Sequence, residues 1–183
     1  MILSNIQRAT DEDEKIVAEQ LKSKSVNLYG VGARCKYGFP IVCVLNCFDK
    51  KGRLDIGFLA TPIWLTCPYL NEKIHNFETN GLISSITNTV NADKAMHRMM
   101  LDSHADYYFF RKELYRACAK ASVLDDVIRF MDKGVGGIAD EYGIKCLHLH
   151  YAHYLLYPTN VVGLMVSRLL KENVNCEHCI CKK

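Results

Sequence analysis

The chain has 183 residues, of which 49% are hydrophobic and 23% charged, and its formal net charge is +3. This length is enough for one domain with a substantial core, and the composition is that of an ordinary globular protein. The weak positive charge, with no dense Lys/Arg cluster apart from Lys182-Lys183, disfavours a dedicated nucleic-acid binder.

The sequence shows no pattern typical of a secreted or membrane protein. Residues 1–5 lack the charged segment and apolar run of a signal peptide, and no apolar stretch reaches the roughly 18 residues that span a bilayer. The nine cysteines are an odd number without an export signal, which favours reduced thiols over a disulfide framework. We therefore expect a cytoplasmic protein with no membrane partner, and we expect some of its thiols to bind metal. The sequence does not determine the oligomeric state.

The first predicted element is a helix near the N-terminus. Thr10 is a typical N-cap, and the acidic residues 11–14 suit the positive end of the helix dipole. An apolar stripe continues this helix through about Ser23. We treat residues 1–25 as a helical extension, and residues 26–183 as a single α+β domain with a cysteine-rich C-terminal tail.

A segment rich in glycine and aromatic residues follows at 29–40. It does not fit a dinucleotide-binding fingerprint, because no helical pattern opens after its glycines. It predicts a loop, or a strand followed by a loop, that presents Arg34 and Cys35.

A small antiparallel hairpin is predicted for roughly residues 40–65. Residues 41–45 have the pattern of a strand, and residues 49–52 that of a turn. Residues 54–65 are predicted to return as a second strand that is broken near Thr61-Pro62. Packed against a mainly helical remainder, this hairpin indicates an α+β fold.

The next helix is predicted to begin at the pair Cys67-Pro68. Proline suits the first helical position, which places Cys67 at the N-cap, and Asn80-Gly81 is a typical stop. A thiol at a helix N-terminus faces unpaired amides and the positive dipole end, which lower its pKa and favour a ligand or a nucleophile. A buried, inert cysteine is the alternative.

The rest of the chain up to residue 138 is predicted to be helical. A short helix covers 82–90, a long one capped by Asn91 runs from 92 to about 121, and another short helix covers 123–131. The glycine-rich segment 134–138 follows, and its amides could cradle an anion. A plain linker between helices is the other interpretation.

Residues 144–156 are predicted to form a central, buried helix, because apolar side chains leave it no polar face. At about 100° per residue, Cys146, His150 and His153 lie on one side, and His148 lies nearly opposite. Buried imidazoles and thiols need partners, and both bind borderline metals and transfer protons near neutral pH. We therefore expect a functional site on this helix.

The last helix is predicted for 161–172, and a tail with three cysteines follows it. Cys176 and Cys179 have the spacing of half a metal site, and Cys181 adds a third thiol. A disordered tail with free thiols is the alternative.

Four segments carry motifs that are specific when taken together: Arg34–Pro40, Trp64–Leu70, Gly136–Ile138 and Lys145–His150. In this order they resemble the bacterial domain of unknown function 501 family. The resemblance runs from about Ala33 to the C-terminal cysteines, so the N-terminal helix is an addition to it. It implies no activity.

This resemblance also separates the cysteines into two groups. Its motifs coincide with Cys35, Cys67 and Cys146, and the family tends to keep a cysteine near its C-terminus. The motifs do not coincide with the cysteines that we expect to pack as small hydrophobic side chains, Cys43, Cys47 and Cys118.

The first functional hypothesis is a metalloprotein with a cysteine-ligated centre. Its ligands would be Cys35, Cys67, Cys146 and one of Cys176, Cys179 or Cys181. Four thiolates suit an iron–sulfur cluster or tetrahedral zinc, and ligands dispersed along the chain favour iron–sulfur, with zinc as the alternative. His148, His150 and Arg34 would line the centre as proton donors or as contacts for a small anionic or phosphorylated ligand.

Two other hypotheses stay open. In a metal-free enzyme, Cys67 would be the nucleophile and His148 or His150 the base. Arg34 and the glycine-rich segment would then hold an anionic substrate. In a non-enzymatic interaction module, the cysteines would bind structural zinc and the aromatic segment 107–110 would dock on a partner.

Overall fold

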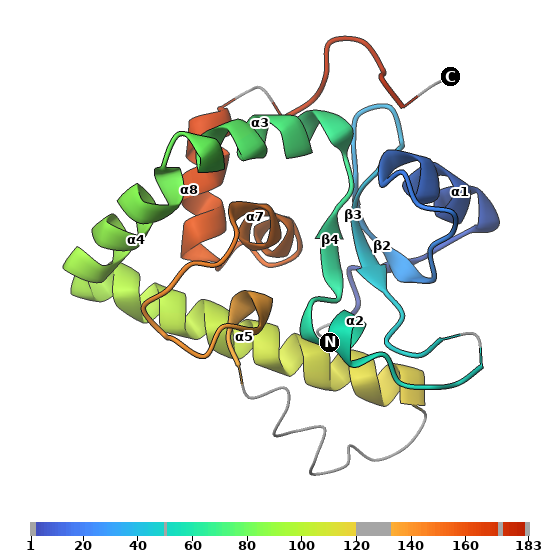
Figure 1. Cartoon of the computed structure of the whole chain (residues 1–183), viewed down its shortest axis with the longest axis horizontal. Coiled ribbons are helices and arrows are strands. Elements are labelled where there is room, and N and C mark those ends of the chain that lie inside the picture. Colours follow the sequence, from blue (N-terminus) through green and yellow to red (C-terminus); the bar gives the residue numbers. More distant parts are fainter. Residues whose placement is uncertain (1–2, 50, 120–132, 172–173, 182–183) are drawn as a thin grey trace.

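The computed structural model describes residues 3–49, 51–119, 133–171 and 174–181. In these residues, helices surround one four-stranded antiparallel sheet, so the predicted, mainly helical α+β class is confirmed (Figure 1). The elements in chain order are β1 (Gln7–Arg8), α1 (Asp11–Gln20), β2 (Leu28–Arg34), β3 (Pro40–Leu45), α2 (Ile56–Ala60), β4 (Ile63–Leu65), α3 (Pro68–Thr79), α4 (Leu82–Ala92), α5 (Lys94–Ala119), the 3-10 turn η1 (Val135–Gly137), α7 (Leu147–Leu156) and α8 (Val161–Leu170).

The sheet divides the buried side chains into two groups. Its strands follow the order β1-β2-β3-β4, every neighbouring pair is antiparallel, and β3 is buried along its whole length. Because side chains alternate along a strand, Val42 and Val44 join the main core, whereas Cys43 and Leu45 pack with Val17 of α1. Figure 1 shows α1 on one side of the sheet and α3, α7 and α8 on the other.

The predicted N-terminal helix is α1, and Thr10 is its N-cap as expected. Thr10 Oγ1 accepts a hydrogen bond from the Asp13 N–H at 3.2 Å, and Asp13 Oδ2 accepts one from the Thr10 N–H at 3.0 Å. This reciprocal pair is a capping box. The helix ends at Gln20, before the predicted end near Ser23, and Gln20 Nε2 donates to the backbone oxygen of Pro40 at 2.9 Å. The capping box stabilises the start of α1, and the Gln20–Pro40 hydrogen bond joins its end to β3.

The helix predicted to begin at Cys67-Pro68 is α3, with Cys67 at the N-cap and Asn80 at the C-cap. The long predicted helix is α5, but its cap is Asp93 rather than Asn91. Asp93 Oδ1 accepts from two backbone N–H groups of the first turn, at 2.7 and 3.0 Å, because the helix starts two residues later than expected. The helix predicted over 123–131 lies outside the described residues.

The prediction of a continuous strand over 54–65 is wrong in its first half. Residues 56–60 form the helix α2, and only Ile63–Leu65 pair with β3, as β4. The break at Thr61-Pro62 separates the two elements rather than interrupting one strand. In α2 the fully buried Leu59 packs into the main core, so a short helix buries this apolar side chain as well as a strand would.

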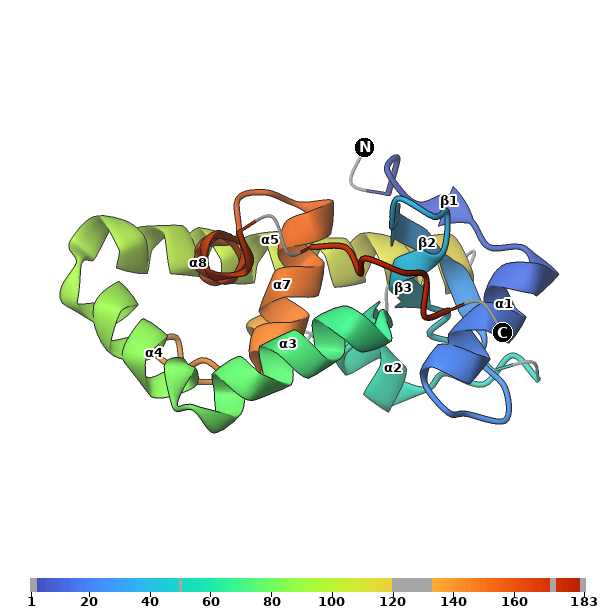
Figure 2. The same ribbon diagram turned by 90° about the horizontal axis from the view of Figure 1, so that it is seen from above.

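The predicted central helix is α7, which is buried along most of its length and lies amid the other helices (Figures 1 and 2). It begins at Leu147 rather than at Ile144, with Cys146 as its N-cap in extended conformation. The final helix, α8, begins after Asn160, whose side chain accepts a hydrogen bond from the Gly163 N–H. It ends at Leu170, with Lys171 as its C-cap, about two residues before the predicted end.

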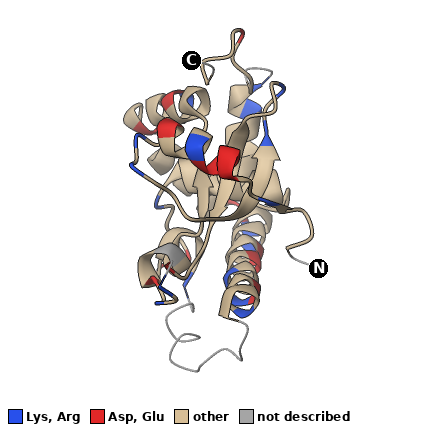
Figure 3. Ribbon diagram, turned by 90° about the vertical axis from the view of Figure 1, so that its right-hand side faces the viewer, with Lys and Arg blue, Asp and Glu red and all other residues tan. Residues whose placement is uncertain are grey.

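Charged side chains are spread over the surface. In the view of Figure 3, acidic and basic residues are interspersed along the helices, and the strands carry few of either. Among the described residues, no helix combines the length and the apolar character needed to cross a bilayer.

Candidate metal centre

The described part of the C-terminal tail, residues 174–181, lies over the turn between β2 and β3 and reaches α1 (Figure 2). Tyr37 Oη donates a hydrogen bond to the backbone oxygen of Glu177 at 2.5 Å, and the Lys36 N–H donates to Asn175 Oδ1 at 3.1 Å. These contacts hold the start of the cysteine motif directly over the β2–β3 turn.

The placement of the tail links five thiols through the effects of their charges on one another, and we call them the thiol cluster: Cys35, Cys67, Cys176, Cys179 and Cys181. Burial raises the pKa of Cys181, and the charges of Cys179, Cys35 and Cys176 raise it further. The charges of Cys181 and Cys176 likewise raise the pKa of Cys67. Gln20 of α1 reaches this group as well, since its Nε2 lies 3.4 Å from Cys181 Sγ. The cluster therefore joins the β2–β3 turn, the start of α3 and the tail.

The expected lowering of the Cys67 pKa is wrong. Burial, which penalises the thiolate, raises the pKa of Cys67 to about 11, although the amides of Leu70 and Tyr69 at the start of α3 act to lower it. Only 6% of the residue is exposed, so desolvation outweighs the favourable end of the helix dipole. Without a cation beside it, this thiol is protonated at neutral pH.

Cys146 lies in a second group, the Glu–Cys–His triad of Glu78, Cys146 and His148. Cys146 Sγ is 3.7 Å from His148 Nδ1, and the same Nδ1 is 3.1 Å from Glu78 Oε1. The three ligand atoms all lie within 4.8 Å of one another. Among the described residues this is the only group of three or more histidine, cysteine or acidic side chains that is close enough to hold one ion.

This arrangement corrects the helical phase that we used for Cys146. We had placed Cys146 beside His150 and opposite His148, but it contacts His148. The reason is that Cys146 is the N-cap, with φ −161° and ψ 126°, so the rotation of about 100° per residue does not apply to it.

Hydrogen bonds on both ring nitrogens hold His148. Its Nε2 lies 3.1 Å from the backbone oxygen of Asn71, which can only accept, so Nε2 carries a proton. Burial would lower the pKa of His148, but Cys146, the Asn71 carbonyl and the Glu78 carboxylate together raise it to about 9. In the neutral ring the Nδ1 lone pair faces Cys146 and Glu78.

The triad borders a cavity of about 260 Å³. Cys146, His148 and Lys145 line it together with mainly apolar side chains, which include Trp64 and Leu149. A small molecule in this cavity would contact Cys146 and His148 directly.

His150 lies elsewhere, fully buried with His153 around Asn160. His150 Nδ1 is 3.2 Å from Asn160 Oδ1, and Asn160 Nδ2 is 2.9 Å from His153 Nδ1. Burial lowers the pKa of His150 to about 4 and that of His153 to about 3. Neither ring reaches the triad or the thiol cluster through a described hydrogen bond, and the pair connects α7 to the start of α8.

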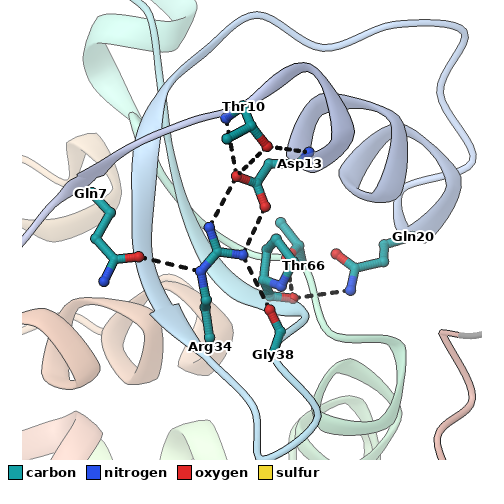
Figure 4. A network of polar contacts seen from close by, with 8 residues as sticks. Gln7, Thr10, Asp13, Gln20, Arg34, Gly38 and Thr66 are labelled. Atoms are coloured by element: carbon teal, nitrogen blue, oxygen red, sulfur yellow. Dashed lines mark hydrogen bonds and ion pairs between the residues drawn. The ribbon is translucent and has the colours of Figure 1, made fainter.

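Arg34 forms a bidentate ion pair with Asp13 (Figure 4). Its Nη1 and Nη2 lie 2.7 and 2.9 Å from the two carboxylate oxygens, and the guanidinium also donates to Gln7 and to the backbone oxygen of Gly38. These hydrogen bonds hold the pKa of Asp13 at about 2. Arg34 thus joins β2 to the capping box of α1, which supports a structural role.

Replacing Arg34 with alanine should lower the free energy of unfolding by about 1–2 kcal/mol, because a charge-assisted, partly buried pair is lost. The matched control is Arg53→Ala, which removes the exposed pair with Asp49 and should cost less than about 0.5 kcal/mol. Urea denaturation measures both. If Arg34→Ala left the stability unchanged but abolished metal or anion binding, a structural role would be wrong.

The three cysteines expected to pack as hydrophobic side chains lie away from both groups of candidate ligands. Cys43 and Cys47 are fully buried. Cys47 shares a thiol hydrogen bond with Cys118 of α5.

A family model described as a protein of unknown function, DUF501, matches residues 31–168. The chain belongs to the DUF501 family. This confirms the resemblance found in the sequence motifs. The DUF501 match begins after α1 and ends within α8, so it includes Cys35, Cys67 and Cys146 but not the tail thiols. The domain boundary near residue 25 stays a prediction. No curated protein and no solved structure shows significant similarity to the chain.

Two residues important to these sites were not found in the sequence. Glu78 accepts from the Leu147 N–H at 2.6 Å and contacts His148, yet it lies about 70 positions away in the chain. Asn160 was predicted only as a helix cap, but it also joins two buried histidines. Glu78 stands near the end of the amphipathic helix α3, and nothing in the neighbouring sequence indicates that it contacts His148.

Proposed function

We propose that this member of the DUF501 family is a metalloprotein whose thiol cluster holds an iron–sulfur centre. The observation that carries the proposal is the position of the tail. Tyr37 and Lys36 anchor it over the β2–β3 turn, where the charges of Cys176 and Cys181 act on the pKa of Cys67 and the charge of Cys35 acts on that of Cys181. Thiolate ligands from three separate segments, one of them at a helix N-terminus, are the kind of set that binds such clusters.

The spacing of the thiols favours a cluster over one zinc ion. With Zn–S bonds of about 2.3 Å, a tetrahedral site brings its sulfurs to about 3.8 Å from one another. Among the described residues, no three of the five thiols lie within 4.8 Å of one another. In a cubane [4Fe–4S] cluster each thiolate binds a different iron, so the ligands lie further apart.

The buried state of Cys67 supports a ligand over a nucleophile. A thiol with a pKa of about 11 supplies almost no thiolate at neutral pH, whereas a metal deprotonates a thiol that it binds. We leave Cys146 out of this centre, because its contacts are to His148 and Glu78. Structural zinc in an interaction module is the second candidate, since the same thiols could rearrange around one ion.

Protein purified without oxygen should be coloured and should contain iron and acid-labile sulfide, about four of each per chain for a cubane cluster. Cys67→Ser and the double variant Cys176→Ser/Cys179→Ser should both lose the colour and most of the iron. The matched control is Cys118→Ser, which removes a half-buried thiol outside the cluster and should keep both.

The outcomes separate the candidates. Colourless protein with stoichiometric zinc, lost on Cys67→Ser, would replace iron–sulfur with structural zinc. Protein with no metal in which Cys67→Ser stays folded would overturn the metal centre. A thermal melt of each variant shows whether metal loss is separate from unfolding.

A further inference from the structure

The Glu–Cys–His triad has the dimensions of a mononuclear zinc site. Tetrahedral zinc with bonds of about 2.3 Å to sulfur and about 2.1 Å to nitrogen and oxygen places S and N about 3.6 Å apart, and N and O about 3.4 Å apart. The corresponding distances are 3.7 Å from Cys146 Sγ to His148 Nδ1 and 3.1 Å from that Nδ1 to Glu78 Oε1. An ion could bind here with only small side-chain shifts.

Hydrogen bonds outside the triad orient its ligands. The Asn71 carbonyl accepts from His148 Nε2, which leaves Nδ1 facing the other two ligands and able to bind a metal ion that displaces its proton. The first backbone N–H of α7, on Leu147, donates to Glu78 Oε1 at 2.6 Å and fixes the carboxylate. Histidines that bind zinc commonly donate their other ring nitrogen to a carbonyl or carboxylate in this way.

The triad supplies three ligands and leaves a side open. The His148 and Glu78 side chains are 24% and 20% exposed, so solvent and small molecules reach them. The cavity beside Cys146 and His148 provides the space for a fourth ligand. Three protein ligands with an open position are typical of catalytic rather than structural zinc.

The cavity wall indicates the ligand class. Trp64 and Leu149 form an apolar surface, and Lys145 adds a cation. A second cavity of about 290 Å³ shares Lys145 and Gly136 with the first, and it is lined by Lys133 and Arg111 but by no acidic side chain among the described residues. A small molecule with an apolar body and an anionic group fits this surface.

We propose that Glu78, Cys146 and His148 bind one zinc ion whose fourth position opens on the cavity, where it accepts an anionic small molecule. The site shares no residue with the thiol cluster and does not depend on it. A bound cation would be a Lewis acid for that ligand or for a water molecule.

Cobalt(II) tests the site, because a tetrahedral Co(II)–thiolate complex has visible d–d bands and a sulfur charge-transfer band. The experiment uses the full-length chain with Cys176, Cys179 and Cys181 replaced by serine, so that the tail contributes no thiolate. This protein should bind one Co(II) with both spectral features, and zinc should displace it.

Variants of the triad identify the ligands. Cys146→Ser should lose the charge-transfer band, and serine keeps a good N-cap for α7. His148→Ala should weaken Co(II) binding at least about 100-fold and Glu78→Gln about 10–100-fold. The matched control is His75→Ala, an exposed histidine on α3, which should leave the spectrum unchanged. Unchanged spectra in both Cys146→Ser and His148→Ala would overturn the site, as would the absence of any charge-transfer band in the parent protein.

Anion titrations of the Co(II) protein test the ligand class. Inorganic phosphate or acetate should shift the d–d bands, and the more effective of the two distinguishes a phosphorylated from a carboxylate ligand. Lys145→Gln should weaken that effect about tenfold while leaving Co(II) affinity unchanged. A spectrum insensitive to both anions would overturn the anionic ligand. Loss of cobalt binding here, with iron and sulfide intact in the wild-type chain, would contradict this site alone.

Discussion

The free energy of unfolding should fall by about 3–4 kcal/mol between pH 7 and pH 5, because His150 and His153 are buried as neutral rings. Their pKa values in the folded chain are about 4 and about 3, whereas an unfolded histidine titrates near 6.5. The unfolded chain therefore binds more protons over this range. Each histidine then removes about 1.4 kcal/mol per pH unit below pH 6.5. This is a large part of the stability of an ordinary domain.

The physical cause is burial, which penalises the charged form of both rings, and the charge of His104 acts in the same direction on each. Asn160 satisfies one nitrogen of each ring, and among the described residues the Nε2 atoms of both have no hydrogen-bond partner. His148 offsets less than about 1 kcal/mol of the loss. Its pKa is raised to about 9, so its stabilising contribution grows only slightly from pH 7 to its full value below pH 6.5 and disappears as the pH rises through 9.

Urea titrations at several pH values measure this slope. His153→Phe keeps a ring of similar size beside Tyr107 and should reduce the slope to about half. His75→Gln changes an exposed histidine and should leave the slope as it is in the wild type. A stability that stays constant from pH 7 to pH 5 would show that the two rings take up protons without unfolding.

Elements with local signals were predicted well. The N-cap at Thr10, the Cys67-Pro68 start of α3 and the long helix α5 all depend on residues within a few positions of one another. The segment 54–65 was mistaken for one strand because a short apolar run has no period that separates a strand from a helical turn. The packing of Leu59 into the main core favours the helix, and this long-range contact cannot be predicted from the neighbouring residues.

The candidate sites, too, were predicted only in part. The residue types pointed to thiols and imidazoles, but their grouping depends on long-range contacts. Cys146 joins Glu78 rather than the other thiols, and the tail reaches Cys35 through contacts about 140 positions apart. The Cys67 pKa shows the same limit, because a local dipole argument cannot include burial by the rest of the fold.

Gly163→Ala should lower the free energy of unfolding by about 1–2 kcal/mol, although alanine is the better helix former. A Cβ at this position in α8 would lie 2.3 Å from Tyr154 Cβ and 2.4 Å from the backbone oxygen of His150. Both atoms belong to α7 and cannot rotate away, so α7 and α8 must move apart. Overpacking of this kind costs about 1–3 kcal/mol or more and exceeds the roughly 1 kcal/mol gained in helix propensity.

Gly57→Ala is the matched control, since Gly57 is also helical, in α2, and its added Cβ would meet only Asp55 Oδ1 at 3.2 Å. It should change the stability by less than about 1 kcal/mol, because a side-chain oxygen can move. Trp64, the single tryptophan, reports unfolding of both variants by fluorescence. Since α7 also carries His148, any displacement in folded Gly163→Ala should weaken Co(II) binding at the triad, whereas Gly57→Ala should not. Equal stability of the two variants would show that α7 and α8 tolerate a wider separation.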